Sequence, residues 1–384
     1  MPIKLQLIVF MLLRTILNTM HRMVYPFLAV FARGLGVEVT TLSLVVTARS
    51  FAGLLGPLFA PIADQRGRKF GMLTGILIFT IGVALVAVYP NFHTLSAALL
   101  LALFGKYFFD PSMQAYFGDR VPYHQRGTAL AVTEAAWSGA FIVGVPAMAF
   151  LIARASWYAP FSVLAVLGVM MFMVIWRIVP HQDEHHERVA NSRDGYRAVF
   201  GSIPALAGVS IALWASAANE IVNLIFGVWL EDSFGLKIAA LAGASAVIGI
   251  SELSGEGLVA LTTDRIGKPR ALVIGLVLNM LASILLPLIG KTQIGALVGL
   301  FLFYITFEYV LVSHIPLMSE LVPKARATML SLNIAGHSIG RALGALLATF
   351  IYQQAGFIFV ALAAVVFNLF GLLALHKMTR AQKS

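Results

Sequence analysis

Ionisable side chains that stand inside long apolar stretches are the residues best placed to do chemistry in this sequence. Arg14, Asn18 and Arg22 recur at helical spacing and so share one face of a helix. Lys106 and Asp110 are four residues apart, which lets opposite charges pair directly on a helix. A charge in an apolar environment is costly unless a partner or water meets it. The pattern therefore predicts a polar, water-accessible cavity that binds a small molecule.

Polar groups of the same kind occur in the second half of the sequence. Asn219, Glu220 and Asn223 lie on one apolar stretch, and Glu308 lies near the middle of another. Any one of these residues alone could belong to a structural ion pair that holds helices together. Taken together, the predicted substrate-binding residues are Arg14, Asn18, Arg22, Lys106, Asp110, Asn219, Glu220, Asn223 and Glu308.

Two carboxylates, Glu252 and Glu256, are four residues apart on one predicted helix. At low dielectric, carboxylates that close resist ionising together. Either a cation such as Arg341 or His337 compensates them, or one of them holds a proton, as proton coupling requires. The candidate proton-coupling residues are therefore Glu252, Glu256, Glu308 and Glu134, with an ordinary ion-pair network as the other interpretation.

The ionisable residues inside the apolar stretches are divided unequally between the two halves of the chain. They carry a formal charge of +2 in the first half and −3 in the second. Opposite charges could form bridges between the halves that break and re-form. Alternatively, the cationic half could bind an anionic group of the substrate.

The composition is too apolar for a soluble protein. Of the 384 residues, 59% are hydrophobic and 11% charged, and the mean hydropathy is +0.88, whereas soluble domains carry about 25% charged residues. This excludes an isolated soluble domain, a disordered chain and a fibrous one. It favours helices that cross a membrane, because lipid requires every backbone group to be satisfied internally. Cysteine is absent, which excludes disulfides and thiolate chemistry.

Apolar runs of about 20 residues predict twelve membrane-spanning helices. Their ranges are 5–32, 41–63, 70–90, 95–118, 127–153, 157–177, 202–230, 238–262, 271–290, 293–319, 327–354 and 356–376. The first is expected to be a retained helix rather than a signal peptide. With a cytoplasmic N terminus, 18 of the 27 Lys and Arg residues fall on the cytoplasmic side, four outside and five within spans. Both termini are therefore expected inside, in an all-α, multi-pass protein of the cell membrane.

The longest polar stretch, 180–201, divides the chain into two predicted bundles of six helices, 1–179 and 202–384. It contains His181, His185 and His186. We interpret it as a solvated cytoplasmic linker rather than a metal site, and no metal site is expected elsewhere. The net charge of +10 is attributed to basic cytoplasmic loops rather than to nucleic-acid binding.

The two halves share an internal repeat. The segment 64–69, DQRGRK, follows the second span, and 264–269, DRIGKP, follows the eighth, 200 residues later. Two further pairs agree with this offset to within one residue: Val121-Pro122 with Val322-Pro323, and Leu35-Gly36-Val37 with Phe234-Gly235-Leu236. Two six-helix halves with a shared plan are typical of transporters whose site lies where the halves meet.

The segment 60–69, APIADQRGRK, resembles the signature loop of the major facilitator superfamily, with Ala60 in place of a Gly and Gln65 in place of an Arg. With the repeat copy and the twelve spans, the resemblance covers the whole chain. It implies that helices one, four, seven and ten line a central cavity. It also implies that the third helix of each three-helix repeat faces lipid. The interiors of the third, sixth, ninth and twelfth spans contain no ionisable residue, as that arrangement requires.

The same resemblance implies a gate. Asp64 and Arg68 would form a charge network with neighbouring helix ends and lock the cytoplasmic side closed. Gly67 supplies the bend of the turn, and Asp119 is the expected partner of Arg68. The alternative is a tight turn that anchors the topology without gating.

Two glycine patterns remain. Gly336, Gly340 and Gly344 repeat every four residues, which permits close helix contact. Gly139, Gly144 and Pro146 loosely resemble the Gly-Pro motif of proton antiporters in this superfamily. Helix packing with a proline kink is the other interpretation.

No phosphate-binding glycine loop or nucleophile–base pattern stands out, so we expect neither an enzyme nor a cofactor. The expected function is secondary active transport by alternating access, with proton-coupled efflux of a small organic molecule as first choice. The alternatives are an uptake symporter or uniporter for a small anionic solute, a lipid flippase or, remotely, a receptor or scaffold. The expected partners are a small-molecule substrate, protons or another coupling ion, and the lipid bilayer, for a chain expected to be a monomer.

Overall fold

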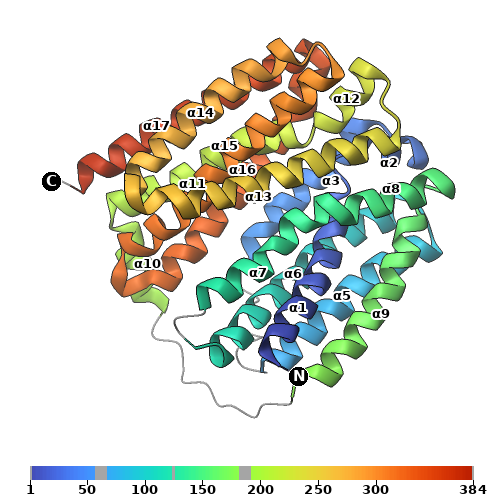
Figure 1. The fold of residues 1–384 in the computed structure, drawn as a ribbon, viewed down its shortest axis with the longest axis horizontal. Coiled ribbons are helices and arrows are strands. Elements are labelled where there is room, and N and C mark those ends of the chain that lie inside the picture. Colours follow the sequence, from blue (N-terminus) through green and yellow to red (C-terminus); the bar gives the residue numbers. More distant parts are fainter. Residues whose placement is uncertain (1, 57–66, 123–125, 181–191, 383–384) are drawn as a thin grey trace. The chain divides into compact units, whose positions relative to one another are not determined.

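The computed structural model describes residues 2–56, 67–122, 126–180 and 192–382, and every regular element that they form is a helix (Figure 1). Eleven of these helices are long and apolar enough to cross a membrane, or twelve when the bent pair α2–α3 counts as one span. The prediction of an all-α, multi-pass membrane protein is confirmed.

Contacts between helices divide the chain into two compact units. Unit 1 comprises Met1–Glu38, Leu55–Glu187 and Lys237–Gly249. Unit 2 comprises Val39–Leu54, Arg188–Leu236 and Ile250–Ser384. Each unit thus takes one short segment from the other half of the sequence.

Unit 1 is built around long helices that pack side by side. Its elements are α1 (Ile3–Arg22), α2 (Leu28–Leu35), α5 (Arg68–Val88), α6 (Phe92–Arg120), α7 (Arg126–Gly139), the π-helical turn η3 (Ala140–Gly144), α8 (Val145–Arg154), α9 (Ala159–Ile178) and the first part of α13 (Ile238–Ile266). Helix α5 packs against both α6 and α9, and α1 packs against α7 (Figure 1). Aromatic rings fill the core between α1 and α6, where Phe10 stacks on Tyr116 with ring centroids 5.7 Å apart.

The first predicted span is interrupted. Helix α1 ends at Arg22, and residues 23–27 form turns before α2 begins. Pro26 explains the break, since it has no N–H and disfavours a helical conformation at Tyr25. The fifth predicted span is continuous but contains the π-helical turn η3 directly before Pro146. A proline cannot donate to the preceding turn, and π-helical turns relieve such mismatches.

Unit 2 contains the longest helices of the C-terminal half. Its elements are α3 (Val39–Ala52), η1 (Gly53–Leu55), α10 (Ser192–Phe200), α11 (Ile203–Asn223), α12 (Phe226–Phe234), the rest of α13, α14 (Lys268–Ile289), α15 (Gln293–Leu321), η4 (Pro323–Ala325), α16 (Arg326–Ala355) and α17 (Phe357–Ala381). Helix α10 lies within the predicted linker 180–201, whose residues 181–191, with all three linker histidines, fall outside the described part of the chain.

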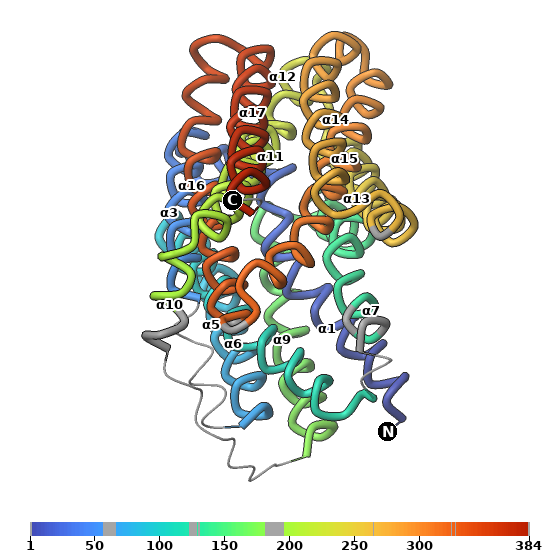
Figure 2. The backbone as a smooth tube through the Cα atoms, turned by 90° about the vertical axis from the view of Figure 1, so that its left-hand side faces the viewer, coloured from blue at the N-terminus to red at the C-terminus, as the bar shows by residue number. Residues whose placement is uncertain are grey.

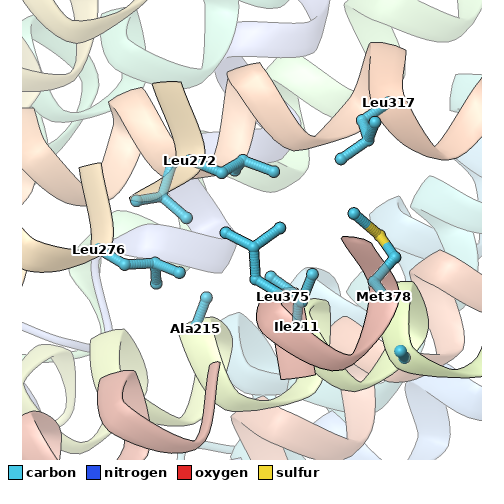
Figure 3. Packing of buried hydrophobic residues seen from close by; sticks show 9 residues of the cluster. Ile211, Ala215, Leu272, Leu276, Leu317, Leu375 and Met378 are labelled. Atoms are coloured by element: carbon cyan, nitrogen blue, oxygen red, sulfur yellow. The ribbon is translucent and has the colours of Figure 1, made fainter. Parts of the chain in front are cut away.

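Helix α17 packs against both α11 and α14 (Figure 2). Its residues Leu375 and Met378 point into a core shared with these two helices (Figure 3). The other members of that core are Ala207, Ile211, Ala215, Leu272, Leu276, Val310 and Leu317. Apolar side chains from four helices, α11, α14, α15 and α17, hold this side of unit 2 together.

The close contact predicted from the glycines of α16 occurs between α16 and α11. A Cβ atom added at Gly340 would lie 2.0 Å from the carbonyl oxygen of Leu213. The same holds one turn away on either side. A Cβ atom added at Gly336 would lie 2.8 Å from the carbonyl oxygen of Val209, and one added at Gly344 would lie 2.7 Å from that of Ala217. No side chain separates the two backbones along this line, which we call the glycine ladder.

The internal repeat is confirmed in the backbone. Gly67 and Gly267 each precede a long helix, with φ of 89° at both positions. Gly36 and Gly235 each end a short helix, with φ of 66° and 61°. Helices α6 and α15 have the same length, 29 residues. Positive φ is readily adopted only by glycine, so the turn positions that the two halves share have a structural reason.

Candidate functional site

Arg14 is the centre of an ion-pair network in unit 1. Its Nε lies 3.1 Å from Oδ1 of Asp110 on α6. Its Nη1 lies 2.7 Å from Oε1 of Glu134 on α7 and donates to the carbonyl of Thr133 at 2.9 Å. The guanidinium, whose side chain is 7% exposed, thus connects α1 to two other helices. The fork of donors on an arginine suits this shared position.

Lys106 completes the network. Its Nζ lies 3.3 Å from Oδ2 of Asp110, one turn along α6, as the spacing predicts. It also donates to Oδ1 of Asn18. Two cations and two carboxylates, Arg14, Lys106, Asp110 and Glu134, therefore balance in charge, and we call them the unit 1 charge cluster. Neutralising one carboxylate would leave a buried cation under-compensated.

Arg22, also on α1, is held differently. Its guanidinium lies 3.5 Å from the ring centroid of Phe141 and 4.4 Å from that of Trp137. Its Nη1 donates to the carbonyl of Trp137 at 3.0 Å. Cation–π contacts of this kind stabilise a guanidinium away from water. Neither ring was predicted from the sequence, although Glu134, Trp137 and Phe141 recur at the spacing that places residues on one face of a helix.

The polar residues predicted on α11 form a chain of hydrogen bonds with α15. The hydroxyl of Tyr304 donates to Oδ1 of Asn223 at 2.7 Å, and Nδ2 of Asn223 donates to Oε2 of Glu220 at 3.4 Å. Tyr304 did not enter the sequence-based set, because a tyrosine near the middle of a span does not differ in pattern from the aromatic residues around it.

Asn219 and Asn18 hold the same place in the internal repeat, one in each unit. Both are buried. Among the described residues, neither Oδ1 of Asn219 nor Nδ2 of Asn18 has a hydrogen-bond partner. A buried amide atom without a protein partner calls for water or ligand. Each unit therefore offers one such group.

The candidate proton-coupling carboxylates of unit 2 gather where α13 meets α15. Glu252 and Glu308 are 3% and 4% exposed. A Cβ atom added at Gly255 would lie 2.8 Å from Cβ of Glu308, so Glu308 lies directly against α13 between the positions of Glu252 and Glu256. Glu308 can pack this closely against α13 because Gly255 has no side chain.

A pair of histidines, of which His314 is buried, was only half anticipated. Nδ1 of His337 on α16 lies 2.6 Å from Oγ of Ser216 on α11. The ring of His314 on α15 lies 6.3 Å from that of His337, centroid to centroid. His314 did not enter the sequence-based set, although a histidine inside a predicted span is itself a signal.

Basic residues of the two repeated turns pair with the ends of long helices. Nε of Arg68 lies 3.5 Å from Oδ2 of Asp119, the partner expected from the sequence. In unit 2, Nζ of Lys268 pairs with Oε1 of Glu320 at the end of α15. In each half, the turn thus pairs with the C-terminal end of the corresponding long helix, α6 or α15. Asp64, the other predicted member of the gate, lies outside the described residues.

Comparison with known proteins agrees with these features. A family model described as Major Facilitator Superfamily matches residues 10–314 and again 258–383. The uncharacterized MFS-type transporter YceJ of Bacillus subtilis is 23% identical over 77% of this chain and 75% of its own. A multi-drug resistance efflux pump PmrA homolog of Lactococcus lactis is 24% identical over 67% of this chain and 66% of its own.

The fold is also similar to that of solved transporters. A bacterial homolog of the human lysosomal transporter Spinster, in an inward-facing and unoccupied conformation, matches with a TM-score of 0.77 at 14% identity. The match covers 100% of this chain and 97% of the other. These findings identify a transporter rather than an enzyme. The chain belongs to the major facilitator superfamily and is a secondary transporter that works by alternating access.

Proposed function

We propose that this transporter exports a small organic molecule across the cell membrane in exchange for protons. The observation that carries the proposal is that Asp110 and Glu134 share Arg14. The side chain of Glu134 is 44% exposed and that of Asp110 only 18%. A proton arriving from water would reach Glu134 first and loosen its bond to Arg14. Such a rearrangement links proton binding to the positions of α1 and α7.

Polar residues within each unit are the proposed substrate-binding residues. In unit 1 these are Arg14, Asn18, Arg22, Lys106 and Asp110, and in unit 2 Asn219, Glu220, Asn223 and Glu308. The unpartnered amide atoms of Asn18 and Asn219 support this assignment, because a substrate can supply the hydrogen bonds that they lack. Glu252, Glu256 and Glu308 would form a second group able to exchange protons.

We propose efflux from the description of a related protein rather than from the geometry of this chain. The relative from Lactococcus lactis is described as a multi-drug resistance efflux pump. We extend efflux to this chain on that similarity, together with the carboxylates near the membrane interior. Uptake of an anionic solute by symport or uniport, and movement of lipid between leaflets, are the outcomes that the experiment below would reveal instead.

The proposed organisation follows from the charge asymmetry of the sequence. Both termini and the linker 180–201 would be cytoplasmic, between bundles 1–179 and 202–384 of a monomer. Asp64, Gly67, Arg68 and Asp119 would then close the cytoplasmic side in one conformation. A reporter that is active only outside the cytoplasm, fused within 180–201, should give no signal.

Transport by proteoliposomes that contain the purified protein tests the coupling. Compounds that raise its Tm in a library screen supply the substrates. Substrate and protons should move in opposite directions, and collapse of the proton gradient should stop uphill transport. Glu134→Gln should uncouple the two movements, while Glu38→Gln, at an exposed carboxylate between α2 and α3, should not. Movement in the same direction would establish a symporter, and transport indifferent to the gradient a uniporter.

A further inference from the structure

Two apolar grooves run along the outside of unit 2, one on each side of the C-terminal half of α17. The first lies between α11 and α17, has a volume of about 350 Å³ and is lined by residues that include Leu206, Trp214, Phe370, Leu373 and Lys377. The second lies between α14 and α17, has a volume of about 370 Å³ and is lined by residues that include Pro269, Arg270, Val273, Leu372 and His376. Phe370, Leu373 and Val273 are 41%, 56% and 45% exposed, so both grooves open outward.

The packing of α17 explains why the grooves exist. Leu375 and Met378 fill the space directly between α11 and α14 (Figure 3). Beside them, small side chains at Ala207, Ser210 and Ala374 leave the first groove unfilled. Apolar grooves of about 350 Å³ and 370 Å³ along packed helices suit a flexible hydrocarbon chain.

Each groove ends at a cation and at the first turn of a helix. Lys377 lines the first groove together with Ile203, the first residue of α11. Arg270 lines the second together with Pro269, in the first turn of α14, and no side chain caps that helix. Helix N-termini and cations both favour anions, and phosphate in particular. Each groove thus combines an apolar body with a cation at its mouth, and Ser202 caps α11 whereas no side chain caps α14.

We propose that these grooves bind anionic phospholipid from the surrounding bilayer. An acyl chain would lie in each groove, and the headgroup phosphate would contact Lys377 in the first groove and Arg270 in the second. Basic pockets between membrane helices recognise anionic headgroups on these physical grounds. This inference is independent of the direction, the coupling and the substrate of transport.

Lipid titration of the purified full chain in detergent tests the proposal. Phosphatidylglycerol and phosphatidylcholine with the same acyl chains are compared by native mass spectrometry, which counts bound lipids, and by the rise in Tm. Phosphatidylglycerol should bind more tightly and raise Tm further. Lys377→Gln and Arg270→Gln should each weaken its apparent affinity about five-fold, without changing that of phosphatidylcholine. The matched control is Arg380→Gln, an exposed cation at the same end of α17 that lines neither groove, and it should change nothing.

A second variant tests the apolar part of the site. Ala374→Trp should fill the first groove and lower the number of bound lipids while leaving both cations in place. Equal affinity for the two lipids would overturn the proposal. So would an Arg380→Gln protein that loses as much affinity as the groove variants, since that indicates diffuse surface attraction. An unchanged lipid count in Ala374→Trp would show that no chain occupies the first groove.

Discussion

The guanidinium of Arg14 lies 2.7 Å from the carboxylate of Glu134, and this contact ties the first helix of the chain to α7. The same guanidinium pairs with Asp110, which also pairs with Lys106. Because each carboxylate serves a different set of cations, losing Asp110 and losing Glu134 should have different consequences.

Asp110→Asn should destabilise the protein much more than Glu134→Gln. Asp110 compensates both Lys106 and Arg14 in a largely buried place, and removing one partner of a buried ion pair costs about 3–5 kcal/mol. Glu134 is 44% exposed, so screening by water should hold its loss to about 1 kcal/mol or less. Thermal unfolding in detergent measures both.

The double variant Lys106→Gln/Asp110→Asn is the control for this comparison. It removes a cation and an anion together and should recover part of the stability that Asp110→Asn loses. Equal losses of Tm in Asp110→Asn and Glu134→Gln would contradict the assignment of Asp110 as the shared buried partner.

Gly255→Val should disturb proton-dependent transport through Glu308. A side chain at Gly255 would collide with Cβ of Glu308, 2.8 Å from the added Cβ, and must push it away from α13. We expect the dependence of transport on external pH to flatten, as it should in Glu308→Gln, where an amide cannot release a proton. Transport rates at a series of external pH values provide the measurement. Gly257→Ala, on the same helix with nothing within 4 Å of its added Cβ, should keep the wild-type profile.

Gly340→Ala should be strongly destabilising. Its Cβ would lie 2.0 Å from a backbone carbonyl, which cannot rotate aside as a side chain can, and overpacking of this kind costs about 1–3 kcal/mol or more. Gly257→Ala is again the matched control, because it adds the same methyl group to a helix in open space and should be neutral or slightly stabilising. If both variants melted at the same temperature, α11 and α16 would not be in contact as described.

Charge removal at the two repeated turns should alter cycling rather than stability. Arg68–Asp119 and Lys268–Glu320 are partly exposed pairs, and pairs of this kind contribute about 0–1 kcal/mol. Asp119→Asn and Glu320→Gln should therefore leave Tm nearly unchanged. If the pairs hold one conformation closed, transport rates should change in both variants.

Charge reversal tests whether the pairing itself matters. Arg68→Glu/Asp119→Arg restores the pair in the opposite orientation and should recover transport relative to either single reversal. Wild-type transport in Asp119→Asn would leave these turns with a structural role alone.

Hydropathy and charge spacing predicted most of the fold correctly. The helices, their apolar lengths and the repeated turns follow from local rules, because the cost of exposing backbone to lipid fixes where a span can lie. Charge spacing gave the pair Lys106–Asp110, and the family resemblance implied Asp119 as the partner of Arg68. The break at Pro26 was overlooked because a hydropathy window averages over a single proline.

The site was less predictable because its contacts join helices that are distant in sequence. Nothing in the spacing of Glu134 says that it faces Arg14, and no pattern distinguishes Tyr304 from neighbouring aromatic residues. Gly255 is a clearer case, since its effect is to make room for Glu308 on another helix. Which positions face each other depends on helix rotation, and that is decided by packing across the whole unit.

The glycine ladder between α11 and α16 has a mechanical consequence. Where side chains separate two helices, the side chains can change rotamer, and the helices can then slide past each other. Helices whose backbone atoms touch directly lack this freedom. We therefore expect the backbones that carry Ser216 and His337 to keep their separation during the transport cycle. We expect α11 and α16 to move together as one rigid pair of helices.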